Sequence, residues 1–335
     1  MTSVAEAGAP SVETLRIALI GCGEVGTIFG RALIARGVAG VVAYDKLMGD
    51  PVRSGALRER ASAAGIALRE SASAVVADAD LVISAVTASE TRAAVDSVAP
   101  ALRRGAFVLD VNSASPRVKA ACGDAIARAG GRYVEAAVMT SVPPYGIQVP
   151  MLLGGPAATA LLPTLATLGF AAKVASERFG VASAIKMSRS VMIKGLEALV
   201  IESYVTARRY GVEDAVIASL AETFPGIDWE RNGDYFFSRV IQHGQRRAEE
   251  MREAAATVRE AGLEPLMTAA IAERQQWLAD LARTGTFATA GDTAWRAQAD
   301  RIAADVKAAS AARVGPDRPG ASAVTAIHAR REDAR

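Results

Sequence analysis

The chain has 335 residues, a formal net charge of +2, two cysteines and two histidines. At about 100–200 residues per domain, this length predicts two domains. The charge is too evenly balanced to supply the clustered phosphate neutralisation of a nucleic-acid-binding protein, so we expect no nucleic-acid partner. Cys22, Cys122, His243 and His328 are too few for a zinc site of structural spacing, and we expect no metal.

The first 14 residues lack the basic start and the apolar stretch of a signal peptide, and no apolar run reaches the ~20 residues that cross a bilayer. We therefore expect a cytoplasmic protein with reduced thiols and no membrane partner. A hydrolase with a nucleophile–histidine pair is disfavoured, because there is no G-x-S-x-G motif and His243 is the one histidine outside the polar C-terminal segment.

Residues 15–178 alternate short apolar runs with Ala-rich helical segments. This order predicts an α/β domain of Rossmann type, with a doubly wound parallel sheet covered on both faces. The expected strands are Leu15–Ile20, Val41–Asp45, Leu81–Val86, Ala106–Val111, Tyr133–Val138, Met151–Leu153 and Ala171–Ala175. Residues 179–312 have helical spacing and predict an all-α C-terminal domain. We expect residues 1–14 to be a flexible start and residues 313–335 a mobile tail.

A glycine motif follows the first expected strand directly. Leu15–Ile20 leads into the sequence GCGEVG and then into a helical stretch, Thr27–Arg36. In such a motif Gly21 permits the tight turn, Gly23 lets a pyrophosphate approach the backbone, and Gly26 allows the helix to pack closely on the strand. This context predicts a dinucleotide site, the alternative being a plain strand-to-helix turn. The expected cofactor-binding residues of this loop are Gly21, Gly23, Glu24, Val25 and Gly26.

Asp45 ends the second expected strand, about 20 residues beyond the glycine motif. A carboxylate there accepts from the adenosine ribose hydroxyls and repels a 2′-phosphate, which favours NAD. NADP stays the alternative because Lys46 and Arg53 could hold a 2′-phosphate, and Asp45 could also simply cap the next loop. Thr87 follows another strand and is expected near the nicotinamide ribose, or as a helix cap.

Small polar residues follow the strand Ala106–Val111. Ser115 and Pro116 have the residue types of a helix N-cap and first helical position. Asn112 and Ser113 stand beside them, where amide, hydroxyl and free N–H groups could hold a substrate carboxylate or hydroxyl. A plain helix cap is the competing interpretation.

Residues 180–208 read as one long, mostly apolar helix with a single polar strip. Lys186, Ser190, Lys194 and Glu197 occur at i, i+4, i+8 and i+11 and so share one face. The strip predicts a helix that lines a cleft, or else a solvated face with a Lys194–Glu197 ion pair. A lysine suits redox chemistry on alcohols, since its ammonium protonates a forming alkoxide and its amine accepts a hydroxyl proton.

The glycine motif, the turn from Asp110 to Pro116 and the lysine that opens a long helix together resemble the β-hydroxyacid dehydrogenase superfamily, over residues 15–310. This superfamily includes 6-phosphogluconate and 3-hydroxyisobutyrate dehydrogenases. The resemblance implies an NAD(P)-dependent oxidoreductase that moves a hydride between nicotinamide and a small-molecule substrate. It implies that Lys186 is the general acid/base and that the turn contacts the substrate through Asn112, Ser113 and Ser115.

Two departures from the family pattern bear on the substrate. Ser190 stands where the family has asparagine, and Met139–Gly146 replaces the family's glycine-rich substrate loop. The chain is similar instead to a phosphogluconate-dehydrogenase-like branch with its own C-terminal helical domain. A wall of valine, prolines and tyrosine would be stiffer and more apolar than glycines, so we expect a bulky or aromatic substrate. The residues of this expected wall are Val142, Pro143, Pro144 and Tyr145.

The family also places a basic residue from a later helix near the substrate, which makes His243 and Arg247 candidates. Ser190, Lys194 and Tyr145 complete the expected substrate site. We further expect a homodimer formed through the helical domain. Two alternatives stay open: an imine reductase, which shares this architecture, and a dinucleotide-binding sensor or scaffold without turnover.

Overall fold

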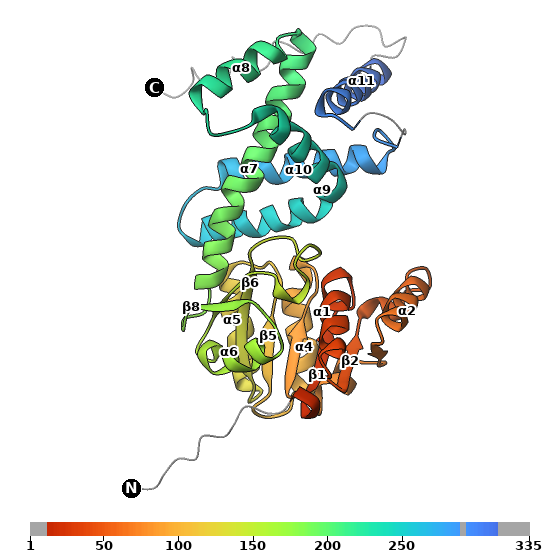
Figure 1. The fold of residues 1–335 in the computed structure, drawn as a ribbon, viewed down its shortest axis with the longest axis vertical. Helices are drawn as coiled ribbons and strands as arrows, with labels where there is room; N and C mark the ends of the chain where they lie inside the picture. The colour runs from red at the N-terminus through yellow and green to blue at the C-terminus, as the bar shows by residue number, and fades with distance from the viewer. Residues whose placement is uncertain (1–11, 289–292, 314–335) are drawn as a thin grey trace, which may run out of the picture. The chain divides into compact units, whose positions relative to one another are not determined.

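The computed structural model describes residues 12–288 and 293–313. Within them an eight-stranded sheet has the order β3-β2-β1-β4-β5-β6-β7-β8 (Figure 1). The strands are β1 (Arg16–Ile20), β2 (Gly40–Tyr44), β3 (Ala67–Leu68), β4 (Leu81–Ser84), β5 (Phe107–Asp110), β6 (Arg132–Val138), β7 (Met151–Gly154) and β8 (Ala172–Ser176). The first six strands are parallel in the order 3-2-1-4-5-6. Ligands of such sheets bind at the carboxyl ends of the strands, where β1 and β4 meet.

Helices cover the sheet, as the alternating pattern predicts. They are α1 (Glu24–Ala35), α2 (Ser54–Ala63), α3 (Ala72–Val76), α4 (Thr91–Val98), α5 (Pro116–Arg128) and α6 (Ala158–Thr167). Short 3₁₀ helices stand in the connections: η1 (Val12–Thr14), η2 (Lys46–Gly49), η3 (Ala88–Glu90), η4 (Ala99–Ala101) and η5 (Gly146–Gln148). The Rossmann-type fold class predicted from the sequence is confirmed.

The sheet differs from the expected one in two respects. Strand β3 was not expected, because its two residues are too few to show a periodic pattern. Strand β7 runs antiparallel to β6, so the sheet is not wholly parallel. The segment between them, residues 139–150, contains only the 3₁₀ helix η5, whereas a parallel crossover usually runs through an α-helix.

The second half of the described chain is helical, as expected. Its helices are α7 (Val181–Tyr210), α8 (Glu213–Thr223), α9 (Trp229–Glu260), α10 (Leu266–Arg283) and α11 (Trp295–Arg313). None of the helices within the described ranges is long and apolar enough to span a membrane.

Contacts divide the chain into two compact units. The first holds the sheet, the chain up to Val200 and the segment Ser238–Asp280, and the second holds Ile201–Phe237 and the chain from Leu281. The division falls inside α7 and α9 rather than at residues 178/179, because the start of α7 and the C-terminal half of α9 bond to loops of the sheet domain. Apart from η1 and the last residue of α11, the expected flexible start and tail lie outside the described residues, as does His328.

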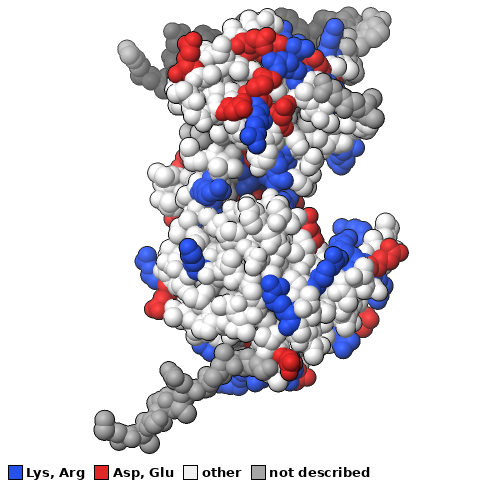
Figure 2. All heavy atoms as spheres, viewed as in Figure 1, with Lys and Arg blue, Asp and Glu red and all other residues white. Residues whose placement is uncertain are grey.

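Apolar side chains fill both faces of the sheet. Along β1, Ile17 and Leu19 belong to one buried cluster and Ala18 and Ile20 to the other, as alternation along a strand requires. In the first cluster Phe29 of α1 meets Phe170 edge-on, with ring centroids 5.2 Å apart. Figure 2 shows that the face in view is mostly uncharged over the middle of the sheet domain.

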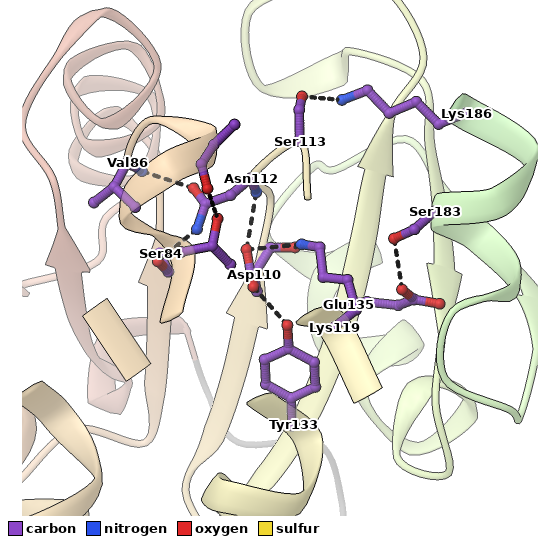
Figure 3. Close-up of polar contacts among 12 residues, drawn as sticks. Ser84, Val86, Asp110, Asn112, Ser113, Lys119, Tyr133, Glu135, Ser183 and Lys186 are labelled. Atoms are coloured by element: carbon purple, nitrogen blue, oxygen red, sulfur yellow. Dashed lines mark hydrogen bonds and ion pairs between the residues drawn. The ribbon is translucent and has the colours of Figure 1, made fainter. Parts of the chain in front are cut away.

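A buried polar network joins β5, α5 and β6 (Figure 3). The Lys119 ammonium lies 2.9 Å from Asp110 Oδ1 and 3.1 Å from the Asp110 carbonyl oxygen, and both side chains are at most 1% exposed. The Tyr133 hydroxyl donates to Asp110 Oδ2, and the Asn112 N–H donates to Asp110 Oδ1. Burial, together with the nearby Asp110 charge, raises the pKa of Tyr133 well above its usual value.

Replacing one member of this ion pair should be costly. We expect Lys119→Met to lower the free energy of unfolding by about 3–5 kcal/mol, because it leaves the Asp110 carboxylate buried without its counter-charge. The double variant Asp110→Asn/Lys119→Met should recover part of that loss, since neither charge is then buried. Urea unfolding followed by circular dichroism measures both. The single variant Asp110→Asn completes the cycle: a loss in the double variant equal to the sum of the two single losses would mean that the pair carries no coupling.

Candidate functional site

The glycine motif spans the loop between β1 and α1 and the first residues of α1, and its three glycines have different surroundings. Gly21 has φ +95°, and a Cβ there would lie 2.4 Å from the Ala85 carbonyl oxygen. A Cβ on Gly26 would lie 2.1 Å from the Gly21 carbonyl oxygen. At Gly23 a Cβ would meet nothing within 4 Å. The backbone is thus closely packed at Gly21 and Gly26 and open at Gly23, where a diphosphate would approach.

Helix α1 begins directly after Gly23, with Glu24 and Val25 as its first residues. The first N–H groups of a helix have no partner within it, and the helix dipole adds positive potential there. This loop therefore fits the diphosphate of a dinucleotide, as its sequence predicts.

Asp45 follows β2 and accepts two backbone hydrogen bonds. Its Oδ2 accepts from the Cys22 N–H at 2.8 Å, and its Oδ1 accepts from the Leu47 N–H at 2.9 Å, which caps η2. The expected loop-capping role is therefore present, and the carboxylate also lies against the glycine loop. The two cations considered for a 2′-phosphate are both paired, Lys46 with Glu90 at 2.6 Å and Arg53 with Asp50 at 2.7 Å.

Thr87 lies just beyond β4, next to the end of β1 in the sheet. It has the position of an N-cap of η3, but its side chain makes no capping bond; its Oγ1 lies 3.4 Å from Ser89 Oγ. Thr87 is exposed at the edge of the sheet where the glycine loop also lies.

Asn112 ties two strand ends together (Figure 3). Its Oδ1 accepts from the Val86 N–H at 2.7 Å and its Nδ2 donates to Ser84 Oγ at 2.9 Å, so both ends of the buried amide are engaged by β4 and the segment after it. Asn112 therefore holds the turn against the end of β4, and its expected contact with a substrate stays a prediction.

Lys186 and Ser113 meet at the carboxyl edge of the sheet (Figure 3). The Lys186 Nζ donates to Ser113 Oγ at 2.6 Å, across 73 positions of sequence. Burial lowers the pKa of Lys186 to about 8, and the like charges of Lys194, Lys119 and Arg246 act in the same direction, while Glu250 opposes them. Near neutral pH the side chain is therefore able to give and to take a proton.

Glu135 of β6 fixes the start of the helix that carries Lys186. Its Oε2 accepts from Ser183 Oγ at 2.7 Å and its Oε1 from the Ala182 N–H at 3.2 Å, in the first turn of α7. A carboxylate at a helix N-terminus satisfies free N–H groups and suits the dipole. Burial nevertheless raises the pKa of Glu135.

The rest of the polar strip on α7 packs against α9 and is buried. Lys194 lies 3.2 Å from Ser190 Oγ and 2.9 Å from Glu250 Oε2, and Glu197 binds Arg247 through two hydrogen bonds. The interpretation of a solvated face with a Lys194–Glu197 ion pair is therefore wrong. Burial opposes ionisation of Glu250, but the positive charges of Lys194 and Lys186 lower the pKa of this carboxyl to about 2.

The two basic residues of α9 that were expected near the substrate, His243 and Arg247, have different surroundings. Arg247 is buried and committed to Glu197, so the prediction that it contacts substrate is not supported. His243 is partly buried, and burial together with Arg239 and Arg246 lowers its pKa. Arg246, which the sequence did not single out, approaches Glu24 of the glycine loop to 3.9 Å.

Ser115 does not cap α5 with its side chain, which corrects the expected N-cap bond. Its N–H donates to Glu253 Oε2 at 2.8 Å and its Oγ donates to Glu260 Oε1 at 2.8 Å. Both carboxylates come from α9, 138 and 145 positions away, so no local sequence signal could have revealed them.

The expected apolar wall is divided between core and surface. Val142 belongs to the buried core under the sheet, whereas Pro143, Pro144 and Tyr145 are exposed. The valine therefore cannot face a ligand, whereas the contact expected of Tyr145 and the bulky or aromatic substrate stay predictions. Among the residues described, no group of three or more histidine, cysteine or acidic side chains could hold a metal ion.

Two family models match the chain. Residues 16–158 match the NAD binding domain of 6-phosphogluconate dehydrogenase, and residues 207–278 match a domain of unknown function, DUF1932. The first covers strands β1–β7 and the glycine loop, and the second covers α8, α9 and most of α10.

Solved structures extend this likeness over most of the chain. A conserved hypothetical protein from Sinorhizobium meliloti is 39% identical, with a TM-score of 0.69 over 87% of this chain and 96% of that one. The conserved protein MTH1747, described as structurally similar to 3-hydroxyacid dehydrogenases, is 32% identical, with a TM-score of 0.63 over 81% and 98%.

The 3-hydroxyisobutyrate dehydrogenase of Mycobacterium tuberculosis shares the fold, with a TM-score of 0.65 over 86% of this chain and 99% of that one, at 17% identity. The glycine loop, the turn after β5 and the lysine of α7 occur in this chain in the expected order and place. The chain belongs to the β-hydroxyacid dehydrogenase superfamily, in the branch that joins a 6-phosphogluconate dehydrogenase-type NAD-binding domain to a C-terminal helical domain.

Proposed function

We propose that the protein is an NAD(P)-dependent oxidoreductase that moves a hydride between nicotinamide and a carbonyl or alcohol carbon, with Lys186 as the general acid/base. The observation that carries this proposal is the Lys186–Ser113 hydrogen bond of 2.6 Å at the carboxyl edge of the sheet. The superfamily consists of NAD(P)-dependent dehydrogenases and reductases, and the glycine loop of this chain fits their cofactor.

In the proposed mechanism the nicotinamide supplies or accepts the hydride when it is bound. Lys186 donates a proton from Nζ to the carbonyl oxygen during reduction and accepts one from the hydroxyl during oxidation. Ser113 orients the ammonium, and Glu135 holds the first turn of α7 in place. Asn112 holds the turn in place through its hydrogen bond to Ser84 of β4.

Lys186→Met should lower kcat for reduction by about 100-fold or more, since the general acid is lost, and should leave cofactor binding unchanged. The matched control is Lys173→Met, an exposed lysine of β8. Stopped-flow measurement of NADH and NADPH oxidation with a panel of ketones and aldehydes tests this. Wild-type reduction should fall as pH rises through about 8, where the ammonium is lost, and oxidation should rise.

The same assay separates the alternatives. An imine reductase would reduce imines and none of the ketones and aldehydes of the panel. A dinucleotide-binding sensor or scaffold would bind cofactor and turn over neither panel. An effect of Lys186→Met equal to that of Lys173→Met would remove the proposed role of the lysine.

We further propose NAD as the preferred cofactor, because Asp45 places a carboxylate beside the glycine loop and both neighbouring cations are already paired. Calorimetric titration should show NADH binding about tenfold or more tightly than NADPH. Asp45→Asn keeps an acceptor for the Cys22 N–H and removes the charge. It should therefore reduce the ratio of the NADPH dissociation constant to the NADH dissociation constant. The control Asp96→Asn, on the exposed face of α4, should leave it unchanged. Tighter NADPH binding by the wild type would overturn this preference.

The homodimer is proposed through an apolar strip on the first part of α7. Ile185, Met192 and Leu199 recur every seven residues and are 43%, 73% and 56% exposed. A strip of this spacing on a long helix suits packing against a second copy.

Met192→Glu/Leu199→Glu should shift the protein from dimer to monomer in sedimentation velocity, with circular dichroism unchanged, because it places charges within the apolar contact. Val52→Glu, at an exposed valine outside the strip, is the control. A wild type that sediments as a monomer at all concentrations would exclude this dimer.

A further inference from the structure

Three hydrogen-bond donors at the start of α5 are occupied by the protein's own carboxylates. The Ser115 N–H is bonded to Glu253 at 2.8 Å, the Ser115 hydroxyl to Glu260 at 2.8 Å, and the Arg117 N–H to Glu260 at 2.9 Å. Glu253 and Glu260 stand two helical turns apart on α9, so one face of that helix presents both to the turn.

These donors belong to the segment that also carries Ser113, the hydrogen-bond partner of Lys186. They form the N-terminus of a 13-residue helix, and Ser115 is two residues from Ser113. Backbone N–H groups and a helix dipole at such a position attract carboxylates. In this chain the carboxylates come from α9 instead.

The charges around the turn also disfavour a second anion. Glu253 and Glu260 both lie within hydrogen-bond distance of Ser115, so one more carboxylate at this position would face two acidic side chains. Lys119, Lys194 and Arg247 each have a carboxylate partner already, Asp110, Glu250 and Glu197 respectively. Their positive charges are therefore largely offset within the protein.

We propose that Glu253 and Glu260 act as built-in anions that exclude a substrate carboxylate from this turn, so that the site takes a substrate that is uncharged next to its reacting carbon. This inference rests on the proposed function and adds the substrate class. It makes Glu253 and Glu260 specificity-determining residues that act through the turn.

The first experiment tests whether the turn is an anion site, without any need for turnover. Glu253→Ala and Glu260→Ala should lower the melting temperature, and increasing acetate should restore it saturably by filling the vacated donors. Wild type and the control Glu249→Ala, whose carboxylate accepts from Gln245 on the same helix, should show no acetate response beyond that of equal chloride. Absence of rescue in both variants, or an equal response in the wild type, would overturn the proposal.

The second experiment tests the substrate class with pairs of hydroxy acids and their amides. Wild type should oxidise the amide with a kcat/KM about tenfold or more above that of the acid. Glu253→Gln/Glu260→Gln keeps hydrogen-bond acceptors and removes both charges, so it should reduce this ratio at least about threefold. Glu249→Gln should leave the ratio unchanged.

The two experiments separate this inference from the proposed function. A wild type that prefers the acids overturns the inference and leaves the oxidoreductase intact. A wild type that oxidises no member of any pair and reduces no carbonyl compound counts against the oxidoreductase, and the acetate measurement still decides whether Glu253 and Glu260 fill an anion site. The Gln variants cover the case in which the Ala variants do not fold.

Discussion

The buried Asp110–Lys119 ion pair is the interaction on which the site depends. Asp110 ends β5, and its carboxylate receives Lys119 from α5, Tyr133 from β6 and the backbone of Asn112. Three elements are thereby fixed around the residue that begins the turn. Because a buried carboxylate without partners is costly, the turn has little freedom to move while these bonds persist. Ser113 consequently meets Lys186 at a defined place, although the two residues come from opposite halves of the chain.

Much of the fold could be predicted from local patterns. The alternation of strands and helices, the glycine motif and the long helix with Lys186 all depend on neighbouring residues, and the structure contains each of them. Strand β3 and the reversal of β7 could not be predicted in this way. Two residues show no period, and the direction of a strand depends on how its connection crosses the sheet.

The site was less predictable, because its decisive contacts join distant segments. Lys186 and Ser113 were both singled out by residue type, and the structure brings them together. The partners of Lys194, Arg247 and Ser115 could not be inferred, since each is a carboxylate on another helix. Helical spacing showed that Lys194 and Glu197 share a face, but not which helix covers that face. The alternative interpretation, a solvated face with a Lys194–Glu197 pair, was wrong for that reason.

The cysteine of the glycine loop has a consequence for the chemistry of the cofactor site. Cys22 is fully buried, its thiol lies 3.8 Å from the Thr27 hydroxyl, and burial raises its pKa. The thiolate, which is the reactive form towards alkylating agents and peroxides, is therefore scarce and shielded. The compact packing of a loop that binds a diphosphate thus also protects the sulfur of Cys22. The rate at which a thiol reagent modifies Cys22 therefore reports how often this loop opens.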